Sequence, residues 1–140
     1  MIYKVFIDTN ILIYAFTDGE DYRYETAESF LVKEIDVSYV YISMQVINEF
    51  CATLIKNKMD FDSIKKYLYE IRNSTTILPV NIETTLKSLY LKAKYNFSWW
   101  DSMLVATALE NDCTIYFSED LQHNQIIEKR LKIINPFENR

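Results

Sequence analysis

Three aspartates lie beside apolar segments that are expected to be buried. A charged side chain in such a place is costly unless it has a partner or a function. Asp8 ends the apolar run VFI, and Asp120 follows shortly after the run TIYF. Asp101 opens a helical stretch, SMLVATAL, that is apolar almost all round. Carboxylates that converge on one pocket repel one another, so such a pocket must take up protons or bind cations. Neither histidine nor cysteine accompanies these acids, and an all-oxygen set favours Mg²⁺ or Mn²⁺ over zinc.

Each acid also has a purely structural interpretation. Ser98 is suited to be the N-cap of the helix that contains Asp101, and Ser-x-x-Asp is a weaker form of the capping box. A carboxylate in the first turn also complements the helix dipole by about 0.3–1 kcal/mol. Asp8 could cap a helix that begins near Ile11, and Glu119 with Asp120 could form a solvated turn. The acids alone leave both interpretations open.

The elements that must position these acids alternate along the chain. Apolar and β-branched runs predict strands at 5–7, 37–42, 75–80, 114–117 and 131–134. Helical periodicity predicts helices from 11 onward and at 22–35, 43–57, 61–71, 81–95 and from 99 onward. This alternation favours right-handed crossovers and a parallel sheet with helices on both faces. Ligands bind outside the carboxyl ends of such strands, which is where Asp8 and Asp120 fall.

Composition favours one α/β domain over residues 1–140. The chain is 49% hydrophobic and 25% charged, with a single glycine and two prolines. So few turn residues argue against an all-β fold and against a flexible linker. With one glycine, no glycine-rich phosphate loop can form. The sole histidine, His123, has no credible partners for a Ser-His-Asp triad and is interpreted as a surface loop residue.

Several features predict a cytoplasmic protein. Cys51 and Cys113 lie in apolar periodic segments, which favours free thiols in a reducing compartment. Lys4 and Asp8 come too early for a signal peptide, and no apolar run approaches the roughly 18 residues of a membrane span. The formal net charge is −5, opposite to that of a generic nucleic-acid binder. Such a charge suits a cation-binding pocket, a basic partner or nothing specific, and composition does not choose among these.

Four motifs in order strengthen the case for a shared site. DTN follows the first strand, QVINE lies near the start of the third helix, SWWDSMLVATAL spans the last helix and FSEDLQ follows the fourth strand. Together they resemble the PIN-domain ribonucleases, and more closely the VapC-like toxins of bacterial toxin–antitoxin pairs. The resemblance covers about residues 1–137. It implies a three-layer α/β/α domain with a central parallel sheet of four to five strands.

The resemblance also implies a site and a reaction. Its catalytic acids fall on Asp8, Glu49, Asp101 and Asp120, of which Asp8, Asp101 and Asp120 would hold Mg²⁺ or Mn²⁺. Thr9, Asn10 and Ser118 match supporting positions. The implied activity is metal-dependent endonucleolytic cleavage of RNA, with a basic antitoxin as partner and a homodimer as the assembly.

Three features complicate this assignment. Glu119 offers a second acid beside Asp120, and helical periodicity alone would leave Glu49 in solvent. A basic stripe for RNA is also lacking, since only a loose cluster of cations appears, at Lys56, Lys58, Lys65, Lys66 and Arg72. One alternative is a non-catalytic PIN scaffold that acts by binding protein. Another is a haloacid-dehalogenase-like phosphotransferase with Asp8 as nucleophile, although Asn10 stands where that family usually has a second aspartate.

Overall fold

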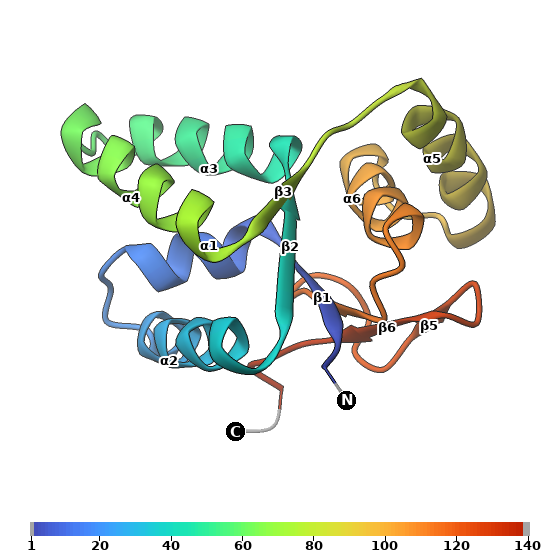
Figure 1. Cartoon of the computed structure of the whole chain (residues 1–140), viewed down its shortest axis with the longest axis horizontal. Coiled ribbons are helices and arrows are strands. Elements are labelled where there is room, and N and C mark those ends of the chain that lie inside the picture. The colour runs from blue at the N-terminus through green and yellow to red at the C-terminus, as the bar shows by residue number, and fades with distance from the viewer. Residues whose placement is uncertain (1, 139–140) are drawn as a thin grey trace.

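A computed structural model describes residues 2–138 as helices packed around one mixed sheet (Figure 1). The elements follow in the order β1 (Lys4–Ile7), α1 (Thr9–Phe16), α2 (Tyr22–Val37), β2 (Tyr39–Ser43), α3 (Met44–Lys56), α4 (Phe61–Ser74), β3 (Thr76–Leu78), α5 (Ile82–Tyr95), α6 (Trp99–Glu110), β4 (Ile115–Phe117), β5 (Ile126–Ile127) and β6 (Leu131–Ile134).

The sheet brings the two acid-bearing strand ends together. Its strand order is β3-β2-β1-β4-β6-β5, and every pairing is parallel except that of β5 with β6. Central strands β1 and β4 are neighbours, with Ile7 opposite Phe117. The pairing continues one step further, because the Asp8 N–H donates to the Phe117 carbonyl oxygen at 3.1 Å. Asp8 and Ser118 therefore leave the sheet side by side.

Helices cover both faces of this sheet. Helices α1 to α4 lie on one side, and α5 and α6 lie on the other (Figure 1). Strand β4 shows how the faces differ, since Phe117 packs edge-on against Phe30 of α2 with ring centroids 4.6 Å apart. Its neighbour Tyr116 points the opposite way and stacks on Phe6 at 5.3 Å. The three-layer prediction is confirmed.

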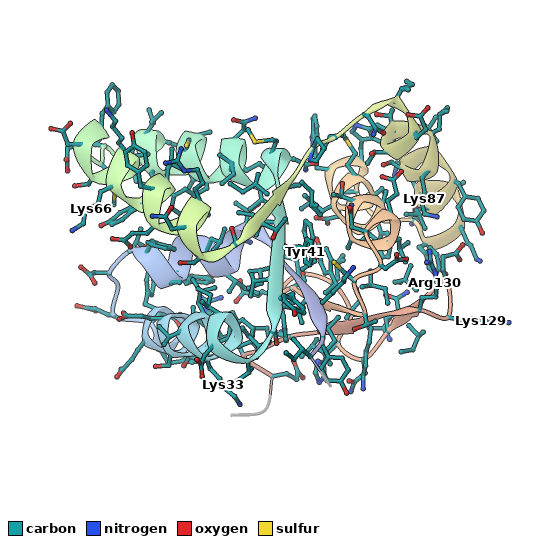
Figure 2. All side chains as sticks on the ribbon, viewed as in Figure 1. Lys33, Tyr41, Lys66, Lys87, Lys129 and Arg130 are labelled. Carbon is teal, nitrogen blue, oxygen red and sulfur yellow. The ribbon has the colours of Figure 1, made fainter. Side chains whose placement is uncertain are left out.

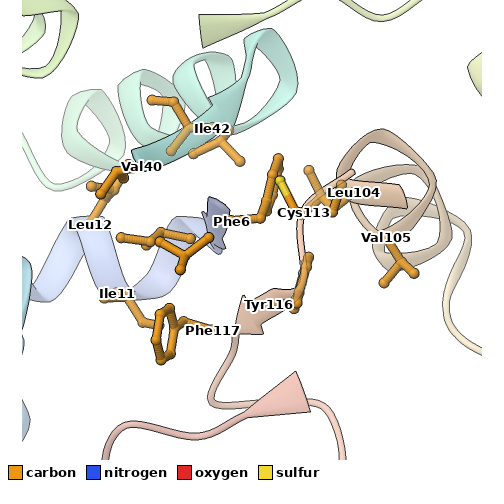
Figure 3. Close-up of a cluster of buried hydrophobic side chains, with 14 of the residues drawn as sticks. Phe6, Ile11, Leu12, Val40, Ile42, Leu104, Val105, Cys113, Tyr116 and Phe117 are labelled. Atoms are coloured by element: carbon orange, nitrogen blue, oxygen red, sulfur yellow. The ribbon is translucent and has the colours of Figure 1, made fainter. Parts of the chain in front are cut away.

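The core between the sheet and α6 explains why that helix is so apolar. Leu104 and Val105 are buried beside Phe6 and Tyr116 (Figure 3). Ala106, Ala108 and Leu109 are buried as well, so α6 exposes little beyond its ends. A helix enclosed in this way reads as apolar all round, and its first turn is held at the edge of the sheet.

The structure differs from several of the predicted element bounds while keeping the predicted fold class. The strand predicted at 37–42 begins at Tyr39, because α2 continues through Val37 and the Ser38 N–H closes it by donating to the Glu34 carbonyl oxygen at 2.8 Å. Helix α4 runs to Ser74, three residues beyond the predicted end. Strand β5 was not predicted, so the sheet has six strands rather than four to five. A two-residue strand is too short to show a period.

Two compositional predictions have structural counterparts. Cys51 and Cys113 are free thiols, with Cys113 buried and Cys51 partly so. Among residues 2–138, no helix is both long and apolar enough to cross a membrane.

Candidate active site

Asp8 is the most buried acid of the site. It ends β1 and caps α1, and only 6% of its surface is exposed. Its Oδ1 accepts a hydrogen bond from the Thr9 N–H at 2.6 Å, and its Oδ2 accepts one from the Ser118 hydroxyl at 3.1 Å. The predicted capping role is therefore real, but one cap does not account for a carboxylate this deep.

Ser118 links two of the predicted acids. Its fully buried hydroxyl donates to Asp8 and accepts from the backbone N–H groups of Asp120 at 3.1 Å and Leu121 at 3.2 Å. The loop after β4 is thereby folded so that Asp120 turns back toward α1. There the Asn10 side-chain amide donates to Asp120 Oδ2 at 3.0 Å.

Glu49 is connected to the site by a hydrogen bond from Thr9. The Thr9 hydroxyl donates to Glu49 Oε1 at 2.7 Å, and Glu49 is partly buried. The expectation from helical periodicity, that Glu49 faces solvent, was wrong. Helix α3 packs against α1 as well as against β2, so a flank away from its main apolar stripe is also enclosed.

Asp101 combines both interpretations that the sequence offered. The Ser98 hydroxyl caps α6 by accepting from the Asp101 N–H at 3.1 Å. The Asp101 side chain lines the same hollow as Asp8, Glu49 and Asp120, a pocket of 330 Å³ at the carboxyl edge of β1. The cap uses the Asp101 N–H, and a hydrogen bond between the Ser98 and Asp101 side chains opposes the rise of the Asp101 pKa. The carboxylate nevertheless lines the pocket.

Glu119 is held away from the pocket by a separate cluster. It accepts hydrogen bonds from the Tyr14 hydroxyl at 3.0 Å and from Arg23 Nη1 at 2.6 Å. Arg23 also pairs with Asp21 at 2.8 Å. Glu119 thus has a cation of its own, whereas none of the described residues that line the acid pocket is basic.

Burial and mutual repulsion raise the proton affinity of the pocket. The pKa of Asp8 is raised to about 7, mainly by burial and in addition by the Asp101 and Asp120 charges, against the opposing effect of the Thr9 N–H and the Ser118 hydroxyl. The pKa of Asp101 is raised by burial and by Glu49, and that of Asp120 by burial, Glu119 and Asp101. These are the shifts expected where carboxylates gather without cations.

The carboxylates are near one another but do not form a finished metal centre. Within residues 2–138, no three acidic, cysteine or histidine side chains are grouped closely enough to hold one ion. Repelling carboxylates are expected to stand apart, and Asp8 and Glu49 are held at the pocket wall by their hydrogen bonds to Thr9 and Ser118. The four acids of the pocket offer only carboxylate oxygens as ligands. Oxygen ligands of this kind fit a hard divalent cation such as Mg²⁺ or Mn²⁺.

Tyr116 is a neighbour of the site that sequence reasoning missed. Its hydroxyl is fully buried and has no hydrogen-bond partner among the described residues. Burial raises the pKa of Tyr116 well above its usual value, and the charges of all four acids, Asp8 first, raise it further. Nothing in the sequence distinguished this tyrosine from an ordinary core aromatic. His123, in contrast, stays outside the pocket, where its Nδ1 accepts from the Asn135 N–H at 3.0 Å.

The Asp8 pKa predicts an unusual pH dependence of stability. The unfolded carboxyl titrates near 3.8 and the folded one near 7, so between these pH values the folded state binds more protons. Stability from this group must therefore fall as the pH rises through that window. Chemical unfolding without metal should show wild type losing about 3 kcal/mol relative to Asp8→Asn between pH 5 and 8, because the loss is about 1.4 kcal/mol per pH unit from pH 5 to the folded pKa. A constant difference between the two proteins would contradict the buried, protonated Asp8.

Comparisons with solved structures give the same fold. The chain is similar to a protein in a toxin–antitoxin complex from Klebsiella pneumoniae, with a TM-score of 0.73 at 18% identity over 96% of this chain and 98% of the other. It is similar to the Mycobacterium tuberculosis toxin VapC20, a sarcin-ricin loop cleaving toxin, with a TM-score of 0.67 at 14% identity over 83% and 91%. A chain of VapBC2 from Rickettsia felis, bound to a DNA fragment from its promoter, gives 0.68 at 16% identity over 94% and 99%.

The sequence comparison identifies the family directly. No curated protein matches the sequence. The family model of the PIN domain, however, matches residues 5–129. That span runs from β1 through the loop after β5, and so includes all four acids of the pocket. The chain belongs to the PIN-domain family.

Proposed function

We propose that the protein is a metal-dependent endoribonuclease and the toxin of a toxin–antitoxin pair. The observation that carries the proposal is the pocket in which side chains from β1, α3, α6 and the β4 loop bring Asp8, Glu49, Asp101 and Asp120 together. VapC20, which has the same fold, is a toxin that cleaves the sarcin-ricin loop. The domain is proposed to extend over residues 1–140, and its place of action is proposed to be the cytoplasm.

In this proposal Asp8, Asp101 and Asp120 hold Mg²⁺ or Mn²⁺. When bound, the cation neutralises the pocket, polarises the phosphodiester and lowers the pKa of water. Ser118 and Thr9 hold Asp8 by both its oxygens, so this ligand needs little reorganisation. Asn10 orients Asp120 in the same way. Glu49 Oε1 accepts from the Thr9 hydroxyl at 2.7 Å, and Oε2 accepts from the Gln45 side-chain amide at the longer distance of 3.5 Å. Oε2, the less tightly held oxygen, is assigned to accept the proton of the attacking water.

An acidic pocket can serve an anionic substrate only if something other than lysine and arginine attracts the phosphate. The labelled cations Lys33, Lys66, Lys87, Lys129 and Arg130 are spread around the periphery, on α2, α4, α5 and the β5–β6 turn (Figure 2). None of these five cations lines the acid pocket. The bound cation is therefore assigned the task of bringing the phosphate in, and the net charge of −5 does not argue against RNA.

The antitoxin is proposed to bind elsewhere, in a hollow of 390 Å³ between α1, α2 and α4. Apolar side chains such as Phe16, Val32 and Tyr67 line this hollow, together with Glu28 and Glu70. Apolar walls with carboxylates suit a basic amphipathic segment. Solved toxin–antitoxin complexes of chains with this fold support the existence of such a partner. The choice of this hollow rests on its lining alone.

A homodimer is proposed through α5. Ile82, Leu86, Leu89 and Tyr90 follow helical spacing and are each at least half exposed. Such a contiguous apolar stripe is unusual on the surface of a monomer. The stripe is separate from the antitoxin hollow, so both contacts can form at once.

Asp101 and Ser98 provide the first test, because they separate the metal site from the cap. Asp101→Asn should stay folded and lose Mn²⁺ binding by calorimetry. Its RNA cleavage should fall by at least about 100-fold, since even residues behind metal ligands account for 10- to 100-fold. Ser98→Ala should lower the free energy of unfolding by about 0.5–2 kcal/mol and keep most activity. If both variants are less stable but fully active, Asp101 has only a capping role and is not a metal ligand.

Asp120 and Glu119 provide a second test on adjacent acids. Asp120→Asn should abolish cleavage of single-stranded RNA, whereas Glu119→Gln should keep it, because Glu119 is engaged by Arg23 and Tyr14. Sequencing of the product ends should show 5′-phosphates and 3′-hydroxyls, which water attack gives when the 3′-oxygen leaves, as the family resemblance implies. Ends bearing 2′,3′-cyclic phosphate would refute the mechanism. No cleavage by wild type with Mn²⁺ would favour the non-catalytic scaffold.

Leu86→Glu tests the dimer. Wild type should be a dimer by light scattering at about 100 μM, where mass action favours assembly. The charged substitution should give a folded monomer, because it puts a carboxylate in the centre of the apolar stripe. A monomeric wild type at this concentration would refute the dimer and leave the chemistry unaffected.

A further inference from the structure

A second hollow adjoins the acid pocket and is not explained by it. This hollow of 640 Å³, here called the tryptophan groove, is lined by residues of α3 and α6 and by the segment between β3 and α5. Glu49 and Ala52 line both the tryptophan groove and the acid pocket. The two hollows therefore meet along one wall formed by α3.

Trp100 is the most conspicuous residue of the groove. It directly precedes Asp101 in the first turn of α6, yet 59% of its surface is exposed. Tryptophan is highly buried on average, so an indole left open beside a site of clustered acids needs an explanation. Capping of α6 does not give one, because Ser98 performs it.

The groove is held in shape by a contact between its two helical walls. The Gln45 side-chain amide on α3 donates to the Trp100 carbonyl oxygen on α6 at 3.2 Å. That bond fixes the backbone from which both the Trp100 indole and the Asp101 carboxylate project. The indole is thus positioned relative to the acid pocket.

The chemistry of the walls limits what the groove can hold. Apolar side chains such as Met44, Pro79, Val80 and Met103 line it beside Trp100, and the amides of Gln45 and Asn48 add uncharged polar groups. Among its described lining residues Glu49 is the only charged one. A phosphate would find no cation here. A flat, weakly polar group that can stack on indole and accept or donate hydrogen bonds fits all of these features.

We propose that the tryptophan groove is a base-binding subsite, in which one RNA base next to the scissile phosphate stacks on Trp100. This inference rests on the proposed ribonuclease function. The wall shared through Glu49 puts the base beside the phosphate that the acid pocket would hold. Stacking on aromatic side chains contributes about 1–3 kcal/mol per base. Stacking also needs no positive charge, and none of the described residues that line the groove carries one.

The test has one arm that requires no cleavage. Cytidine, which carries no phosphate for the acids to repel, should shift the indole N–H signal of Trp100 in NMR spectra, and ribose should not. Trp99→Phe leaves Trp100 as the only tryptophan and so identifies the signal. This arm decides the subsite even if the chain cuts no RNA. An unmoved Trp100 signal in saturated cytidine would overturn the proposal.

The second arm measures RNA cleavage. Trp100→Ala should raise KM by about 5- to 150-fold, the equivalent of 1–3 kcal/mol, with kcat changed much less and with base preference at the cut lost. Trp100→Phe should restore most of the affinity. Phe61→Ala is the matched control, since Phe61 is a 72% exposed aromatic that lines neither hollow. An unchanged KM in Trp100→Ala would overturn the subsite and leave the ribonuclease function standing.

A second copy of the chain is the competing occupant of the groove. Light scattering of Trp100→Ala distinguishes it from RNA. A variant that remains a dimer while its KM rises supports the base-binding subsite. Conversion of the dimer to monomers by Trp100→Ala alone would show that the groove is a contact between copies, and the proposal would then be wrong.

Discussion

Gathering carboxylates in one partly buried pocket costs free energy, and much of the architecture follows from that cost. Two carboxylates 4 Å apart repel by about 4 kcal/mol at an effective dielectric of 20. The chain responds with fixed neutral donors rather than with cations. The Thr9 N–H and the Ser118 hydroxyl hold Asp8, the Thr9 hydroxyl holds Glu49 and the Asn10 amide holds Asp120. Neutral donors fix the geometry of the acids without cancelling the negative potential that a cation would use.

The residue next to Asp120 is stabilised in the opposite way, because Glu119 is paired with a cation, Arg23. Glu119 is paired with Arg23 and bonded to Tyr14, which ties the loop after β4 to α1 and α2. Its neighbour Asp120 is left to the pocket. Had Arg23 reached Asp120 instead, the pocket would contain an internal counter-ion and its demand for an external one would be lower. Separation of these two acids is therefore part of how the site keeps its charge.

Sequence reasoning anticipated which acids share a pocket where a local pattern and the global fold pointed to the same residue. Asp8 and Asp120 follow from the carboxyl ends of parallel strands, and Asp101 stands out against the apolar α6. Glu49 came only from family resemblance, because its partner Thr9 is 40 positions away in sequence and periodicity pointed it to solvent. Tyr116 and the Arg23–Glu119 pair were not foreseen for a similar reason. Both depend on tertiary contacts, whereas strand β5 was missed because two residues show no period.

A pocket of carboxylates repels the phosphates of RNA, so affinity for RNA needs another source. The acid pocket and the tryptophan groove would contribute to it in different ways. Electrostatic attraction dominates most nucleic-acid binding, yet none of the described residues that line this pocket is basic and the net charge is negative. A bound cation would attract a phosphate but would not distinguish one base from another. The tryptophan groove has the reverse properties, since its apolar and amide walls offer stacking and hydrogen bonds without charge. Trp100 and Asp101 are adjacent in one helical turn, so base recognition and phosphate chemistry would be positioned by the same cap at Ser98.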